Sequence, residues 1–254
     1  MSEVNFDFHG KNYVVVGASS GIGRQIAIEL AEAGASVLAI ARNEAALQEL
    51  STQHPGVTSA TLDVITATIE DWKNLSSNYI EQKGKINGAV YTAGITGEIS
   101  LRAYDEELAN KIMATSYNGA IKAIHVLTRK KIAVPGASYV IFSSESAHTG
   151  QRGLFAYSAA KAAVAAAAKT LAHDLARDKQ RINTISPGYV ITTMTQKTEE
   201  RIDIREKMES KHLLGLGQAQ DISGMALFLL SERAKWITGQ DFVIDGGAMP
   251  GAWS

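Results

Sequence analysis

The chain has 254 residues, 45% of them hydrophobic and 20% charged, which is enough to bury one large core, and no stretch resembles a linker, so we expect one domain over residues 1–254. A formal net charge of −1 with interspersed signs excludes the strongly basic surface that binds nucleic acid or anionic membranes. The absence of cysteine excludes disulfides, thiolate metal ligands and a cysteine nucleophile, and no metal site is predicted.

The first residues of the chain predict its location. Residues 1–7 are acidic and lack the basic and then apolar order of a signal peptide. No apolar run approaches the roughly 18 residues that a membrane-spanning helix needs. We therefore expect a cytoplasmic protein without a membrane partner.

The first predicted unit is a strand, a glycine-rich turn and a helix. A β-branched run at 11–16 leads into Gly-Ala-Ser-Ser-Gly-Ile-Gly at 17–23, and apolar residues then recur at helical spacing. Glycines at this spacing let the backbone pass close to a pyrophosphate and direct helix N–H groups at it. The predicted dinucleotide contacts in this turn are Gly17, Ser19, Ser20, Gly21, Ile22 and Gly23.

The same turn permits a second interpretation. Residues 17–21 also fit G-x-S-x-G, the nucleophile elbow of α/β-hydrolases, with Ser19 as the nucleophile and His173 or His212 as a possible base. Only one strand fits before Gly17, whereas several strands normally precede a hydrolase elbow. A serine hydrolase therefore remains the alternative enzyme class.

The second unit indicates which dinucleotide is bound. A strand over 36–42 precedes a helix that Asn43 can cap. An acid at the end of this strand would bind the ribose 2′-OH of NAD, and an arginine there would accommodate the 2′-phosphate of NADP. Ala41 is not an acid, and Arg42 follows it, so NADP(H) is favoured over NAD(H), with Ser19 as a second phosphate ligand. Glu44 is interpreted as a first-turn helix acid.

Strands and helices continue to alternate through the rest of the chain. Helices are predicted at 67–82, 105–132 and 221–230, and strands at 57–62, 86–91, 138–143, 181–186 and within 236–247. About seven strands alternating with helices predict an α/β fold of the Rossmann type. Its doubly wound parallel sheet would be flanked by helices and bind its ligand at the carboxyl ends of the strands.

One helix carries a pair of side chains suited to proton transfer. Residues 156–179 are rich in alanine, leucine and lysine, and Tyr157 and Lys161 lie four residues apart on one face of this helix. An ammonium beside a phenol would lower the pKa of the tyrosine, which suits a general acid or base. Ser144 lies thirteen residues before Tyr157, at the end of a predicted strand, where its hydroxyl can face the helix.

Ser144, Tyr157 and Lys161 at this spacing resemble the catalytic signature of the short-chain dehydrogenase/reductase family. The glycine turn, Pro-Gly at 187–188 with Thr192, and Asp-Gly-Gly at 245–247 are similar to further motifs of that family. The resemblance implies an NADP(H)-dependent carbonyl reductase or alcohol dehydrogenase that moves a hydride between the cofactor and a small-molecule carbonyl or secondary alcohol. It also implies that Tyr157 acts as general acid or base.

The resemblance implies roles for further residues. Asn118 would distort its helix and hold a water beside Lys161, completing a catalytic set of Asn118, Ser144, Tyr157 and Lys161. Tyr91 and Thr92 stand where the family usually has two asparagines, although Thr92 could bond the backbone instead. The cofactor contacts implied beyond the glycine turn are Arg42, Asp63, Val64, Ala93, Gly94, Tyr157, Lys161, Pro187, Gly188, Val190 and Thr192.

The resemblance also implies a mobile substrate lid at about 193–217 and a homo-oligomer, a tetramer or dimer, built partly on the alanine-rich face of 162–172 and the last strand. The substrate is not identified. Polar residues between Ser144 and Tyr157 could suit a hydroxylated or anionic carbonyl compound, or they could form a solvated loop: Glu145, Ser146, His148, Gln151 and Arg152. A non-catalytic NADP-binding regulatory protein is the third interpretation, because fold alone does not give function.

Overall fold

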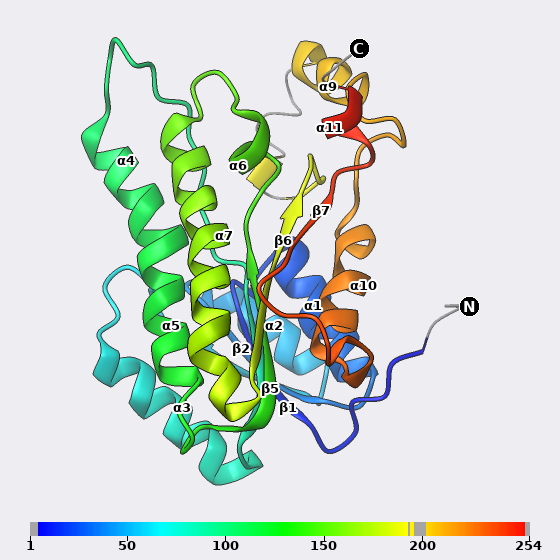
Figure 1. The fold of residues 1–254 in the computed structure, drawn as a ribbon. Helices are drawn as coiled ribbons and strands as arrows, with labels where there is room; N and C mark the ends of the chain where they lie inside the picture. The colour runs from blue at the N-terminus through cyan, green and yellow to red at the C-terminus, as the bar shows by residue number, and fades with distance from the viewer. Residues whose placement is uncertain (1–4, 193, 196–201, 252–254) are drawn as a thin grey trace.

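A computed structural model describes residues 5–192, 194–195 and 202–251. Its centre is one sheet of seven parallel strands in the order β3-β2-β1-β4-β5-β6-β7 (Figure 1), which confirms the predicted doubly wound fold. The strands are β1 (Asn12–Val16), β2 (Ser36–Ala41), β3 (Val57–Thr61), β4 (Ile86–Tyr91), β5 (Ala133–Phe142), β6 (Arg181–Pro187) and β7 (Asp241–Ile244).

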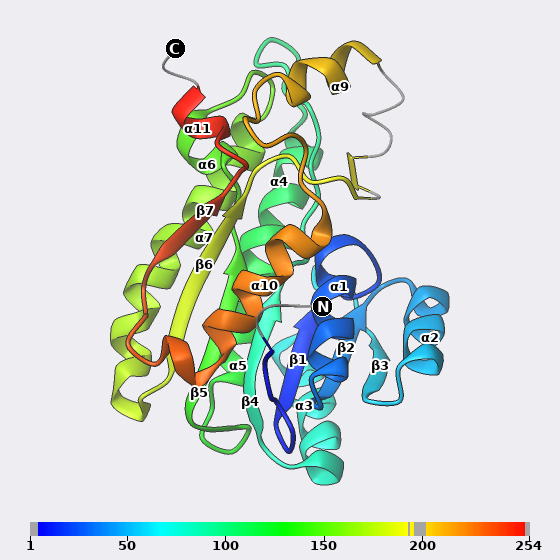
Figure 2. The same cartoon turned by 90° about the vertical axis from the view of Figure 1, so that its right-hand side faces the viewer.

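Helices cover both faces of the sheet (Figures 1 and 2). One face packs against α1 (Gly21–Glu32), α2 (Glu44–Gln53) and α10 (Ala219–Leu230). The other packs against α3 (Ile69–Lys83), α5 (Gly119–Leu127) and α7 (Phe155–Leu175). Further α-helices among the described residues are α4 (Glu106–Met113), α6 (Ser146–Thr149), α9 (Ile202–Glu209) and α11 (Ala248–Gly251), and short 3-10 turns lie at Ala176–Asp178 and Glu232–Ala234.

Strand alternation explains why the chain has two hydrophobic layers. All five residues of β1 are buried, and successive side chains point to opposite faces of a strand. Tyr13 and Val15 join the layer under α1 and α10, while Val14 and Val16 join the layer under α5 and α7. A strand buried on both faces reads as a continuous apolar run, as the sequence does here.

Side chains fix the starts of two of these helices. The Asn43 side chain accepts a hydrogen bond from the Ala46 N–H at 3.2 Å, which confirms the predicted cap of α2. Thr68 and Asp71 form a capping box at the start of α3, where the Thr68 hydroxyl accepts from the Asp71 N–H at 3.1 Å and Asp71 accepts from the Thr68 N–H at 2.8 Å.

Several element boundaries differ from the sequence predictions. The single helix expected at 105–132 is divided into α4 and α5 by a π-helical turn at Ala114–Asn118. The α-helix expected to end at residue 179 ends at Leu175, and a 3-10 turn at Ala176–Asp178 follows it, before Lys179 takes a left-handed backbone conformation with φ 56°. Strand β5 begins five residues earlier than expected, at Ala133 rather than Ser138.

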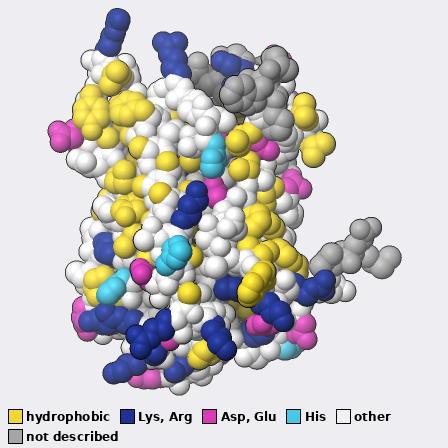
Figure 3. Space-filling model, in the orientation of Figure 1, with side chains coloured by type: hydrophobic (Ala, Val, Ile, Leu, Met, Phe, Trp, Pro, Cys, Tyr) yellow, Lys and Arg dark blue, Asp and Glu magenta, His cyan; other side chains and the backbone are white. Residues whose placement is uncertain are grey.

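Segment 193–217, predicted as a lid, is partly described. Helix α9 lies beyond the carboxyl ends of the strands (Figure 2), and residues 193 and 196–201 lie outside the described residues. Among the described residues, no helix is long and apolar enough to cross a membrane. The face drawn in Figure 3 carries hydrophobic side chains among charges of both signs, in agreement with the small net charge.

Candidate active site

A cavity of about 790 Å³ lies at the carboxyl ends of the central strands. Its walls come from the turns that follow β1, β2, β4, β5 and β6, together with the start of α7. In parallel sheets these turns meet where the strand order reverses, which here is between β1 and β4. The sequence placed the ligand at this edge.

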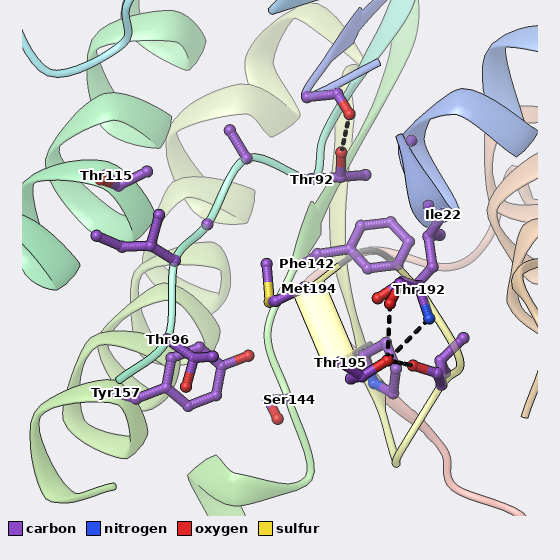
Figure 4. A pocket seen from close by; sticks show the side chains of 18 of the residues that line it. Ile22, Thr92, Thr96, Thr115, Phe142, Ser144, Tyr157, Thr192, Met194 and Thr195 are labelled. Atoms are coloured by element: carbon purple, nitrogen blue, oxygen red, sulfur yellow. Dashed lines mark hydrogen bonds between the residues drawn. The ribbon is translucent and has the colours of Figure 1, made fainter. Parts of the chain in front are cut away.

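The glycine turn forms one end of the cavity. Gly17 has φ +90°, and a Cβ atom on Gly17 would lie 2.8 Å from the Ala93 nitrogen, so only glycine fits there without strain. The Thr92 hydroxyl donates to the Val16 carbonyl at 2.8 Å (Figure 4), which joins the ends of β1 and β4 and confirms the predicted role of Thr92.

The start of α1 suits an anion. Ser20 precedes the helix without a side-chain cap, and the first turn contains no acidic residue. Its N–H groups can therefore bind phosphate oxygens. Every contact predicted in this turn lines the cavity: Gly17, Ser19, Ser20, Gly21, Ile22 and Gly23. The turn therefore fits the pyrophosphate of a dinucleotide.

Arg42 lies where the sequence placed it, directly after β2. Its side chain is 57% exposed, lines the cavity, and lies 3.9 Å from the Asp63 carboxylate. Asp63 does not line the cavity, because its carboxylate turns back to accept a hydrogen bond from the Ile65 N–H at 2.9 Å. Val64 does line it. The cofactor contact predicted for Asp63 stays a prediction, since the other oxygen of this carboxylate faces Arg42.

Ser144 and Tyr157 lie close together in the cavity wall, Ser144 on the turn after β5 and Tyr157 on the first turn of α7 (Figure 4). Lys161 lies one helical turn further on, with its nitrogen 5.7 Å from the centre of the Tyr157 ring. The buried ammonium donates a hydrogen bond to the Phe142 carbonyl at 2.8 Å. The structure thus brings together the three side chains of the signature.

The pKa of Tyr157 differs from what the sequence led us to expect. Burial raises the pKa of Tyr157, while hydrogen bonding with Ser144 lowers it and the nearby charge of Glu145 raises it further. Burial also lowers the pKa of Lys161 from 10.5 to about 8. The net direction is therefore opposite to the expected lowering of the Tyr157 pKa, because burial is the largest effect on this phenol and the Lys161 ammonium is directed at the Phe142 carbonyl.

Asn118 is not beside Lys161, so this prediction requires correction. The helix is distorted as expected, but Asn118 ends the π-helical turn with its side chain exposed and outside the cavity wall. Ser116 takes the inner position instead, buried to 1% exposure. A Cβ atom on Gly94 would lie 3.4 Å from the Lys161 nitrogen and 3.7 Å from the Ser116 hydroxyl, so both groups face the same point.

The turn after β6 lies opposite Ser144. The Pro187 carbonyl accepts a hydrogen bond from the Glu145 N–H at 3.0 Å, which fixes this turn to the one that follows β5. The Thr192 N–H donates to the Thr195 hydroxyl at 2.8 Å, and that hydroxyl donates to the Val190 carbonyl at 3.0 Å. The predicted contacts that line the cavity from β4 and β6 are Ala93, Gly94, Pro187, Gly188, Val190 and Thr192.

The sequence did not indicate several other wall residues. Apolar and hydroxyl side chains from five segments also line the cavity: Ile95, Thr96, Thr115, Leu154, Tyr189, Met194 and Met208. Thr96 and Met194 lie near Tyr157 and Thr192 in Figure 4. No motif marks these residues, because their position depends on how distant turns meet.

The geometry gives no support to the hydrolase alternative. Within the described residues, no hydrogen bond joins Ser19 to a histidine. His173 is exposed on α7, and His212 uses both ring nitrogens elsewhere, with Nε2 accepting from the Tyr189 N–H at 3.1 Å and Nδ1 lying 2.6 Å from the Met208 carbonyl. A base for Ser19 is therefore lacking among the candidates.

Comparisons with known proteins agree with the geometry. A family model described as enoyl-(acyl carrier protein) reductase matches residues 17–249. A 3-oxoacyl-(acyl-carrier-protein) reductase of Staphylococcus epidermidis is 30% identical over 93% of this chain and 98% of its own length. An L-xylulose reductase of Caenorhabditis elegans is 30% identical over 96% of this chain and 97% of its own. A solved short-chain type dehydrogenase/reductase of Mycobacterium ulcerans superposes with a TM-score of 0.89 at 28% identity, covering 96% of this chain and 92% of that one.

Proposed function

The chain belongs to the short-chain dehydrogenase/reductase family of oxidoreductases, and from this premise we propose that it is an NADP(H)-dependent reductase that interconverts a carbonyl and a secondary alcohol. One observation supports the proposal most directly. Tyr157, Ser144 and Lys161 converge in the wall of the cavity whose other end is the glycine turn. A proton donor and a dinucleotide site thus share one cavity.

The preference for NADP(H) over NAD(H) rests on Arg42. Its side chain follows β2 directly and reaches the cavity with more than half of its surface exposed. A guanidinium can bind a phosphate through two parallel hydrogen bonds. The Asp63 carboxylate, 3.9 Å away, partly neutralises the charge of this guanidinium. The end of β2 carries Arg42 and not the acid that would bind the ribose 2′-OH of NAD.

In the proposed mechanism, the nicotinamide supplies the hydride when the cofactor is bound. Tyr157 donates its proton to the carbonyl oxygen of the substrate, and Ser144 donates a hydrogen bond to the same oxygen. Burial raises the pKa of Tyr157 from its ordinary value, so the phenol holds its proton near neutral pH and acts as the general acid in reduction. The Lys161 ammonium stabilises the phenolate that remains.

Ser116 takes the place that the sequence assigned to Asn118. The buried Ser116 hydroxyl has no hydrogen-bond partner among the described residues and faces the same point as the Lys161 nitrogen. We propose that Ser116 holds part of a hydrogen-bonded path through which the Lys161 ammonium passes a proton to the Tyr157 phenolate and then regains one from solvent. Asn118 has no role in this scheme.

The first test is titration of the protein with NADPH and with NADH, followed by cofactor fluorescence, and then turnover of a panel of ketones, aldehydes and keto-sugars. The proposal requires tighter binding of NADPH and measurable reduction. Tyr157→Phe should bind NADPH as the wild type does and lose turnover. Binding of NADPH without turnover by the wild-type protein would instead favour the regulatory interpretation, and binding of neither cofactor would refute both.

We also propose a homo-oligomer, a tetramer or dimer, and a substrate lid formed around 193–217. Strand β7 is a terminal strand of the sheet, with Val243 39% exposed, and a free strand edge together with the alanine-rich helix α7 can pack against a second copy. Sedimentation at micromolar concentration tests the assembly, and a monomer would refute it.

A further inference from the structure

The inference concerns the chemical class of the substrate, and it rests on the proposed function. Glu145 follows Ser144 directly and lines the same cavity, although it is only 8% exposed. Its backbone N–H donates to the Pro187 carbonyl at 3.0 Å, so the residue is held between the turns after β5 and β6. Glu145 is therefore part of the wall where a substrate bound at Ser144 and Tyr157 would continue.

The carboxylate of Glu145 is incompletely satisfied. Within the described part of the chain, one side chain donates a hydrogen bond to it, that of Gln151 at 3.1 Å. No described cation lies within ion-pair distance. Burial raises the pKa of Glu145 on balance, while the charges of His212 and Lys211 and the hydrogen bond from Gln151 lower it and the charge of Asp245 raises it. Buried carboxylates are costly unless hydrogen-bond donors reach them, so a donor on the substrate would be favoured.

The basic residues near Glu145 in sequence point away from the cavity. Arg152 is exposed and does not line the wall, and His148 lies 2.7 Å from Asp241, outside the cavity. Glu98 adds a second acid to the wall on the same side. Two cations also line the cavity, but Arg42 lies after β2 at the dinucleotide end, and the Lys161 ammonium is directed at the Phe142 carbonyl. The two acids therefore disfavour an anionic substrate, which the sequence had left open, and favour a neutral one that carries hydrogen-bond donors.

We propose that Glu145 accepts a hydrogen bond from a hydroxyl group that the substrate carries close to its reacting carbonyl. The substrate class is then uncharged hydroxy ketones and keto-sugars, with the corresponding polyols in the reverse direction. Glu145 sets specificity by contact with the substrate, and Gln151 positions its carboxylate.

The test compares ketones that differ by one group. Wild-type protein and the variants Glu145→Gln and Glu145→Leu are assayed with NADPH on 3-hydroxybutan-2-one, butan-2-one and pyruvate. The wild type should favour the hydroxy ketone over the plain ketone about ten- to a hundredfold in kcat/KM, the contribution of a hydrogen bond to a charged acceptor. Glu145→Leu should bring this ratio close to one, and Glu145→Gln should reduce it severalfold while raising the relative rate on pyruvate.

Ratios between substrates separate specificity from damage to the fold. A purely structural role would lower turnover of both ketones equally and leave the ratio unchanged, which would overturn the inference. Glu81→Leu is the matched control, because Glu81 is exposed on α3 and does not line the cavity. This variant should keep the wild-type ratio. Equal turnover of the two ketones by the wild type would overturn the inference but leave the proposed reductase intact. Absence of turnover on every ketone would overturn both.

Discussion

Replacing Lys161 with methionine should change the pH dependence of folding as well as abolish turnover. The ammonium is 4% exposed, and its pKa falls from 10.5 to about 8 because burial disfavours the charge. Below pH 8 the lysine is charged in both the folded and the unfolded chain, so burial of the charge lowers the free energy of unfolding. Between pH 8 and 10.5 the unfolded chain binds more protons than the folded one.

The magnitude follows from those two values. A difference of about 2.5 between the pKa values corresponds to about 3 kcal/mol of unfolding free energy, and about 2.5 kcal/mol of it is recovered between pH 7 and pH 10. The stability of the wild type should therefore rise with pH relative to that of Lys161→Met. The variant also loses the hydrogen bond to the Phe142 carbonyl, so the difference at a single pH is not informative.

The assay is urea unfolding of both proteins at pH 7 and pH 10, extrapolated to water. Other groups titrate alike in both proteins, so their effects cancel in the difference. Lys169→Met removes a lysine from an exposed position on the same helix, and its difference from the wild type should not change with pH. A difference between wild type and Lys161→Met that stays constant within about 0.5 kcal/mol would refute the buried charge.

Three further outcomes are expected. In the reductive direction kcat/KM should fall as pH rises through about 8, because Lys161 loses its proton there, and a flat profile up to pH 10 would remove Lys161 from the mechanism. Arg42→Ala should weaken NADPH binding by about tenfold or more and leave NADH binding within about twofold, as fluorescence titration would show. Thr68→Ala should lower the unfolding free energy by about 1 kcal/mol through loss of the capping box, without changing kcat/KM.

The sequence predicted most of the fold because each unit carries a local signal. The buried run of β1, the glycines at 17 to 23 and the cap at Asn43 each depend on neighbouring residues alone. The pair Tyr157 and Lys161 was equally local, since one regular helix fixes both side chains on one face. These predictions required no knowledge of tertiary contacts.

The predictions that needed correction depended on distant parts of the chain. Residues 114 to 118 form a π-helical turn, and which of their polar side chains faces Lys161 follows from the packing of that turn, so Ser116 and Asn118 could not be told apart in sequence. The burial of Glu145 depends on Pro187, more than forty residues later. The pKa of Tyr157 likewise depends on burial by segments far apart in the chain.

The π-helical turn at Ala114–Asn118 also determines which way α4 faces. It contains one residue more than an α-helical turn would, and one residue turns an α-helix by about 100°. Ile112, just before it, is fully buried and packs in a small cluster with Ile99 and Ala160, and Tyr157 lies against this cluster. Deleting a single residue from the turn would restore a regular helix and rotate Ile112 out of the cluster. The extra residue therefore shifts the register of the helix, so that α5 packs on the sheet while α4 packs against α7, the helix that carries Tyr157.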